Sequence, residues 1–136
     1  MCIRDRANID SEGKDITIVS YSNMVNVAKE AIAAEELKNY SIELIDLQTV
    51  SPIDYDTIKT SLKKTKKLLV CQEAPSNSSV GTTVISKIVE SELFQELEIA
   101  PKLVSGLHSP MPSAKHLELN VIPQVEDITN AVKSML

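Results

Sequence analysis

The stretch 71–84, CQEAPSNSSVGTTV, holds the polar side chains that are best placed for chemistry in this sequence. It lies between an apolar run and a helical pattern, and such loops form ligand sites at the carboxyl ends of strands in open α/β sheets. Glu73 follows the run directly, so its carboxylate could polarise a ligand or hold an arginine of another chain. We favour the simpler interpretation, in which Glu73 accepts backbone N–H groups of its own loop. His108 likewise has two interpretations, a contact at the rim of a site or an ordinary loop histidine.

The common catalytic and cofactor motifs are missing from the sequence. With three glycines in all, Gly13, Gly81 and Gly106, it has neither the dinucleotide fingerprint nor the phosphate loop, which need glycines at fixed spacing. His108 and His116 lie eight residues apart in a proline-broken loop, which is not a zinc-ligand pattern. No Gly-x-Ser-x-Gly elbow is present. We therefore assign no catalytic, cofactor-binding or metal-ligating residue.

Composition narrows the class of protein further. The chain has 136 residues, of which 43% are hydrophobic and 3% aromatic, so one domain with an aliphatic core is expected. A net charge of -5 argues against nucleic-acid binding and permits a basic protein partner. No apolar run reaches the ~18 residues of a membrane span, so no membrane partner is predicted. Cys2 and Cys71 form no metal pattern, and Cys71 lies in a predicted buried strand, which favours an inert thiol in a reducing compartment.

Strand and helix patterns alternate along the chain, which predicts a largely parallel sheet between two helix layers. A single domain covers residues 15–136, while residues 1–14 show no periodicity and stay unassigned. A lysine group near residue 65 fits a helix end, where it complements the helix dipole. The predicted strands are 15–21, 41–47, 68–71 and 102–105, the predicted helices are 24–39, 54–64, 80–97 and 125–136, and the proline-rich stretch 106–123 is predicted to be irregular.

Five motifs occur in an order and at distances that are typical of one protein family: DITIVSYSNMVNVAKEA, IDLQTVSPIDYDTI, CQEAPSNSSVG, SPMPSAKHLE and IPQVEDITNAV. Together they closely resemble the C-terminal domain of the beta subunit of the thiamine-dependent decarboxylating component of pyruvate dehydrogenase. Branched-chain 2-oxo acid dehydrogenase beta subunits look much the same, and transketolase shares the domain more distantly. The likeness runs from about residue 9 to residue 136. Its most specific piece is IDLQTVSPID, where the family favours Ile-Asp-Leu-Arg-Thr-Leu-x-Pro-Leu-Asp.

The resemblance implies a three-layer α/β/α sandwich with a mostly parallel five-stranded sheet and one antiparallel strand. The fifth strand would then lie in 1–14 or 106–123. It also implies a complete subunit more than twice this length, whose other half binds thiamine diphosphate with magnesium and carries the catalytic histidine. This segment would bind neither and would be inactive alone.

The resemblance implies partners as well: an alpha subunit and a second beta subunit in a heterotetramer. A small basic subunit-binding domain of the acyltransferase core would meet an acidic surface, which agrees with the net charge of -5. The implied location is the bacterial cytoplasm or the mitochondrial matrix.

The loop after the third predicted strand departs from the family pattern Glu-Ala-Pro-Arg-Thr-Gly-Gly-Phe-Gly-Ala-Glu. Glu73, Pro75 and Gly81 match it, but Ser78 and Ser79 replace the glycine pair. Serine takes a positive φ less easily than glycine, which argues against a close approach there, and Ser79 can cap the following helix. We expect this loop to turn a corner and face a partner subunit. The candidate interface residues are Glu73, Pro75, Ser79, Gly81, His108, Pro110 and Pro112.

The leading hypothesis is a C-terminal fragment of a pyruvate dehydrogenase beta subunit. The alternatives are a branched-chain beta-subunit fragment, a stand-alone protein-interaction module and a small-molecule regulatory domain. Residues 1–6, MCIRDR, match nothing in the family, and we interpret them as a remnant of a truncated reading frame.

Overall fold

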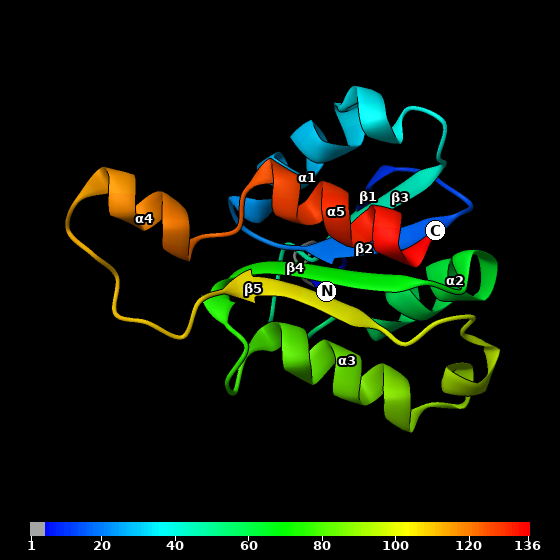
Figure 1. The fold of residues 1–136 in the computed structure, drawn as a ribbon. Coiled ribbons are helices and arrows are strands. Elements are labelled where there is room, and N and C mark those ends of the chain that lie inside the picture. The colour runs from blue at the N-terminus through cyan, green and yellow to red at the C-terminus, as the bar shows by residue number, and fades with distance from the viewer. Residues whose placement is uncertain (1–4) are drawn as a thin grey trace.

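The computed structural model describes residues 5–136, and these form one sheet between two layers of helices (Figure 1). The sheet order is β1-β3-β2-β4-β5, with β1 antiparallel to β3 and all other neighbours parallel. This confirms the α/β sandwich with one antiparallel strand. The strands are β1 (Asn8–Ser11), β2 (Ile16–Ser20), β3 (Ile42–Asp46), β4 (Leu68–Pro75) and β5 (Lys102–Gly106).

Helices cover both faces of the sheet and create two separate cores. One core lies under α1 (Met24–Ala33) and α5 (Val125–Met135), and the other under α2 (Tyr55–Thr65) and α3 (Val80–Glu90). Successive side chains of a strand point to opposite faces, so the central strand β2 feeds both cores. Its Ile16 and Ile18 enter the first core and its Val19 enters the second.

Two predicted helices were too long. The helix expected over 24–39 ends at Ala33, and a 3-10 helix, Glu35–Leu37, follows. The helix expected over 80–97 ends at Glu90, where Ser91 becomes extended and its hydroxyl donates to the Ile88 carbonyl at 2.6 Å. A serine that caps an open carbonyl in this way competes with helix continuation, a signal that apolar periodicity does not contain.

The fifth strand lies near the N-terminus, in the first of the two ranges expected. Ile9 of β1 pairs with Ile45, and the Ser11 hydroxyl donates to the Ile42 carbonyl at 3.2 Å. The next turn crosses β3 so closely that a Cβ on Gly13 would lie 2.2 Å from the Ile42 carbonyl carbon. Residues 8–14 are therefore a folded element, although their exposed polar sequence carries no strand periodicity. Residues 1–4 of the predicted remnant lie outside the described residues.

The stretch 106–123, predicted to be irregular, contains a helix. Helix α4 (Lys115–Val121) projects to the left of the body in Figure 1, and none of its residues is buried. The prediction missed it because its three prolines suggested a loop, whereas Pro110 and Pro112 precede the helix and Pro123 follows it. No helix in the described part of the chain is both long and apolar enough to cross a membrane.

Candidate functional site

A buried glutamine organises the loop after β4. Gln72 is fully buried, and its Nε2 donates to the carbonyls of Ala74 and Pro75, both at 3.1 Å. Its Oε1 accepts the Gly81 backbone N–H at 2.7 Å. One side-chain amide therefore ties the end of the strand to the first turn of α3. The prediction had singled out Glu73 and overlooked this neighbour.

Gly81 leaves room for the side chains that α3 meets on the sheet. A Cβ at this position would lie 2.6 Å from Gln72 Oε1 and 2.6 Å from Leu103 Cδ1, distances that real Cβ atoms essentially never show. The Gly81 side of α3 therefore packs directly on β4 and β5. Close packing of α3 on the sheet within this chain therefore accounts for the glycine that position 81 shares with the family pattern.

The start of α3 is capped as predicted. Ser79 Oγ accepts the Thr82 N–H at 3.3 Å, and Thr82 Oγ1 accepts the Ser79 N–H at 3.1 Å, which completes a reciprocal capping box. The preceding residue, Ser78, takes a φ of 45°, in the left-handed region. Serine thus adopts here the conformation for which glycine is better suited, at a cost of about 1–2 kcal/mol. The loop keeps a glycine-type backbone without the glycine.

Glu73 does not accept backbone N–H groups of its own loop in the described structure, so the favoured interpretation was wrong. Its Oε1 instead accepts a hydrogen bond from Asn23 Nδ2 at 3.4 Å, across the gap to the loop after β2. Burial, and secondarily the Glu73 carboxylate, raises the pKa of Tyr21 above its ordinary value. Glu73 therefore lies with Tyr21 and Asn23 at the carboxyl edge of the central strands, half-buried and able to accept a donor from outside.

The structure divides the seven predicted interface residues into two groups. Four of them, Glu73, Pro75, Ser79 and Gly81, lie in or beside the loop that Gln72 closes. Pro75 is paired with Gly106 at the end of β5. The other three, His108, Pro110 and Pro112, lie beyond β5 on the projecting segment, and within residues 5–136 no hydrogen bond joins the His108 ring to Glu73.

The only thiol in the described residues is not poised for chemistry. Cys71 is fully buried in β4, and burial raises the pKa of its thiol to about 12. A thiol in this environment stays protonated at neutral pH, and the thiolate is the nucleophilic form. Residues 5–136 also contain no group of three or more His, Cys, Asp or Glu side chains that could hold a metal ion.

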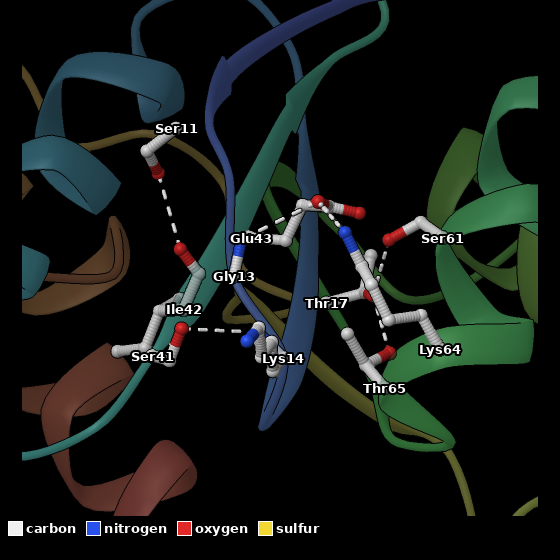
Figure 2. Close-up of polar contacts among 10 residues, drawn as sticks. All are labelled: Ser11, Gly13, Lys14, Thr17, Ser41, Ile42, Glu43, Ser61, Lys64 and Thr65. Atoms are coloured by element: carbon white, nitrogen blue, oxygen red, sulfur yellow. Dashed lines mark hydrogen bonds and ion pairs between the residues drawn. The ribbon is translucent and has the colours of Figure 1, made fainter.

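A second polar cluster lies between α2, the strands β2 and β3, and the turn that follows β1 (Figure 2). Glu43 of β3 is 1% exposed, and its Oε1 accepts Lys64 Nζ at 2.6 Å and the Gly13 N–H at 3.3 Å. Burial alone would raise the pKa of Glu43, but hydrogen bonds from Lys64, Ser61 and Gly13 outweigh it and hold the pKa below its ordinary value.

The neighbouring hydroxyls complete this cluster. Thr17 Oγ1 lies 2.6 Å from both Ser61 Oγ and Thr65 Oγ1, so the one polar side chain in the middle of β2 has two partners on α2. Buried polar groups that are paired in this way fix the register of the elements that carry them. The cluster therefore fastens α2 and the N-terminal turn to the sheet.

Together, the fold and the Gln72 loop define a three-layer α/β domain whose strand-end loop is closed on itself. Comparison with known families then places it: the chain belongs to the transketolase C-terminal domain family, whose model matches residues 5–128.

Curated relatives of the chain are beta subunits of the pyruvate dehydrogenase E1 component. The one from Rickettsia bellii is 38% identical over 130 residues, covering 96% of this chain and 40% of that protein. The mitochondrial one from Pisum sativum is 38% identical, covering 94% of this chain and 35% of that protein. The human mitochondrial one is 37% identical, covering 96% of this chain and 36% of that protein. The chain thus spans between a third and two fifths of these relatives.

Solved structures agree on the fold. A split gene transketolase described as an inactive beta4 tetramer superposes with a TM-score of 0.80 at 23% identity, covering 99% of this chain and 43% of that one. The 2-oxoglutarate:ferredoxin oxidoreductase from Magnetococcus marinus superposes with a TM-score of 0.63 at 14% identity, covering 98% of this chain and 20% of that one.

Proposed function

We propose that this chain serves as the C-terminal assembly domain of a pyruvate dehydrogenase beta subunit. The observation that carries this proposal is the identity of 37–38% with pyruvate dehydrogenase beta subunits along 94–96% of the chain. The geometry of the strand-end loop supports a packing role, because the Gln72 amide hydrogen-bonds to the loop, to the Gly81 N–H and to the Tyr21 hydroxyl, and Gly81 allows α3 to pack closely on the sheet. The complete enzyme would decarboxylate pyruvate oxidatively and acylate lipoyl groups.

Thiamine diphosphate and magnesium would be held elsewhere in that enzyme. Magnesium requires oxygen ligands arranged as an octahedron, and the described residues group no such set of carboxylates. At the carboxyl edge, the Gln72 amide is fully used and the Glu73 carboxylate accepts from Asn23. These residues do not fit the cofactor, so we derive no chemical step through it here. Their role in the proposal is to hold the strand-end loop rigid against a neighbour.

The proposed partners are an alpha subunit, a second beta subunit and the basic subunit-binding domain of an acyltransferase core. The net charge of -5 favours a basic partner. Half-buried Glu73 would accept a cationic or amide donor from one of these neighbours. A branched-chain beta-subunit domain remains the alternative, since the two families look alike along the motifs of this chain.

A domain exchange tests the proposal. Residues 5–136 would replace the matching region of the Rickettsia bellii beta subunit, and the hybrid would be co-expressed with the alpha subunit of that organism. We expect the hybrid to retain the alpha subunit and to decarboxylate pyruvate when thiamine diphosphate and magnesium are added, whereas the host protein without its C-terminal domain should not assemble. A folded hybrid that fails to retain the alpha subunit contradicts the proposal. Assembly in a branched-chain host alone would favour the alternative.

A further inference from the structure

The loop that joins β4 to α3 has an exposed two-residue tip, Asn77 and Ser78. The two ends of this tip are held together, because the Ser79 hydroxyl donates to the Ser76 carbonyl at 3.2 Å. The Ser79 N–H is bound as well, since it donates to Thr82 Oγ1 at 3.1 Å. Within residues 5–136, in contrast, neither the Asn77 amide nor the Ser78 N–H forms a hydrogen bond. The tip therefore has a fixed base while its own polar groups face water.

An asparagine in this setting can react with its own backbone. Asparagine is thermolabile in proteins, because the backbone nitrogen of the next residue can attack the carbon of its side-chain amide. Folding prevents this attack in two ways. A large side chain on the next residue shields the nitrogen, and a hydrogen bond from its N–H holds it away from the amide. Neither protects Asn77, because the Ser78 side chain is a single hydroxymethyl group and its N–H faces water.

Each of the six other asparagines in the sequence has at least one of these protections. One of them, Asn130, precedes the small residue Ala131, but both lie inside α5, where N–H groups are bonded along the helix. The Tyr40 N–H, which follows Asn39, donates to the Leu37 carbonyl at 3.1 Å. A larger side chain than that of serine follows the remaining asparagines and Asn39 itself, in the pairs Asn8-Ile9, Asn23-Met24, Asn26-Val27, Asn39-Tyr40 and Asn120-Val121.

We propose that Asn77 converts spontaneously into aspartate and isoaspartate, with the Ser78 backbone nitrogen as the nucleophile and water as the other reactant. Hydroxide removes the Ser78 N–H proton, and the nitrogen forms a bond to Asn77 Cγ. The bond from Cγ to Nδ2 then breaks, and the departing nitrogen takes a proton from water, which releases ammonia and regenerates hydroxide. Water finally opens the resulting succinimide ring at one of its two carbonyl carbons. No electron donor or acceptor is needed.

The two products change the loop differently. Opening of the ring at Cγ keeps the ordinary main chain and adds one negative charge close to the start of α3, where the helix dipole favours an anion. Opening at the main-chain carbonyl carbon gives isoaspartate, which lengthens the main chain by one methylene group. This extra group lies between the Ser76 carbonyl and the Ser79 hydroxyl, whose hydrogen bond closes the tip, so isoaspartate disturbs the path into α3. The reaction needs only the chain and water, so this inference stands apart from the proposed function.

Ageing of the full chain tests the inference. The chain is kept for several weeks at neutral pH and physiological temperature, and samples are analysed by ion-exchange chromatography and by peptide mapping with mass spectrometry. We expect a more acidic form to accumulate with release of an equal amount of ammonia, and both aspartate and isoaspartate to appear at position 77. Conversion at each of the other six asparagines should be several-fold slower. In urea those six should speed up, whereas Asn77 should change least, because the folded chain already leaves its tip open.

Three variants sharpen the test. Ser78→Gly should form the acidic species several-fold faster, since glycine shields the nitrogen less, and the φ of 45° at this position suits glycine, so the loop keeps its conformation. Asn77→Gln should lose the reaction at this position, because the longer side chain closes a ring less easily. Ser113→Gly, which changes an exposed serine outside the loop, is the matched control and should age at the rate of the parent chain.

Four results would overturn the inference. The first is an Asn77 that stays intact while another asparagine converts, and the second is a Ser78→Gly variant that ages no faster than the parent chain. The third is aspartate without isoaspartate, which would indicate direct hydrolysis by water and exclude the Ser78 nitrogen as the nucleophile. The fourth is an Asn77 that folding protects as strongly as it protects Asn39, because the tip would then be closed in the folded chain.

Discussion

Replacing Gln72 by leucine would test whether one buried amide holds the strand-end loop in place. The substitution keeps the volume of the side chain and removes all of its polar atoms. The buried Gly81 N–H then loses its partner at 2.7 Å, and no other acceptor is bonded to it. The carbonyls of Ala74 and Pro75 also lose their donor, and the Tyr21 hydroxyl loses its acceptor at 3.4 Å. Ala74 is exposed and Pro75 and Tyr21 are half-buried, so these three groups can turn to water.

The expected loss in the free energy of unfolding comes mainly from the buried Gly81 N–H, because the other groups can reach water. Leaving a buried donor unsatisfied costs about 1–3 kcal/mol, whereas carbonyls that reach water cost little. A loss near 2 kcal/mol would lower the melting temperature by about 6–10 °C in a domain of this size. The added apolar surface of leucine does not cancel this loss, because only one of the two hydrogen-bonding partners has been replaced.

Calorimetry of the full chain at neutral pH measures the effect. Gln95→Leu, at an exposed position with no side-chain hydrogen bond in the described structure, is the matched control and should change the melting temperature by no more than a degree or two. Gln72→Glu should be worse than Gln72→Leu at pH 7 and should recover as the pH falls, because its buried carboxylate faces two carbonyl oxygens until it is protonated. If Gln72→Leu melts with the parent chain, the loop does not depend on this amide and the reasoning fails.

Two further predictions concern buried ionisable groups. Because the pKa of Glu43 is depressed in the folded chain, its contribution to stability is present above the ordinary glutamate pKa and is lost as pH falls through the folded pKa. Glu43→Gln should therefore cost about 1.5–3 kcal/mol at neutral pH and make the melting temperature fall less steeply below pH 5, whereas parallel pH profiles of the two proteins would contradict this coupling. Cys71 should resist thiol reagents at neutral pH in a Cys2→Ser background and react fully in denaturant, because its pKa is about 12; rapid labelling of the folded chain would show that β4 opens.

The sheet and both cores were predictable because their signal is carried by apolar side chains at regular spacing. All five residues of β2 are buried, and the run ITIVS is β-branched at four of its five positions. Helix ends were less predictable, since Ser91 stops α3 through a hydrogen bond to Ile88 that no periodicity reveals. The edge strand β1 carried no pattern at all, because most of its residues face solvent.

The polar contacts that position the strand-end loop and the N-terminal turn were the hardest to foresee. Lys64 was interpreted as a helix-end lysine, yet it reaches Glu43, which lies 21 residues earlier in the sequence. Gln72 gave no signal, since a glutamine after an apolar run looks like the start of a loop and is instead fully buried. Long-range hydrogen bonds of this kind depend on which elements become neighbours, and this information arises only after the sheet has formed.

The serines that replace the family's glycine pair show how a missed hydrogen bond can change an inference about function. From the sequence, Ser78 argued against a glycine-type backbone and hence against a close approach to a neighbour. In the structure Ser78 takes a φ of 45°, and Ser79 and Thr82 cap the helix behind it. The capping box and the hydrogen bond from the Gly81 N–H to Gln72 offset the local strain, so the loop can keep the backbone path that a glycine would give. The serine side chains, not the backbone, then decide how closely a partner can pack against this loop.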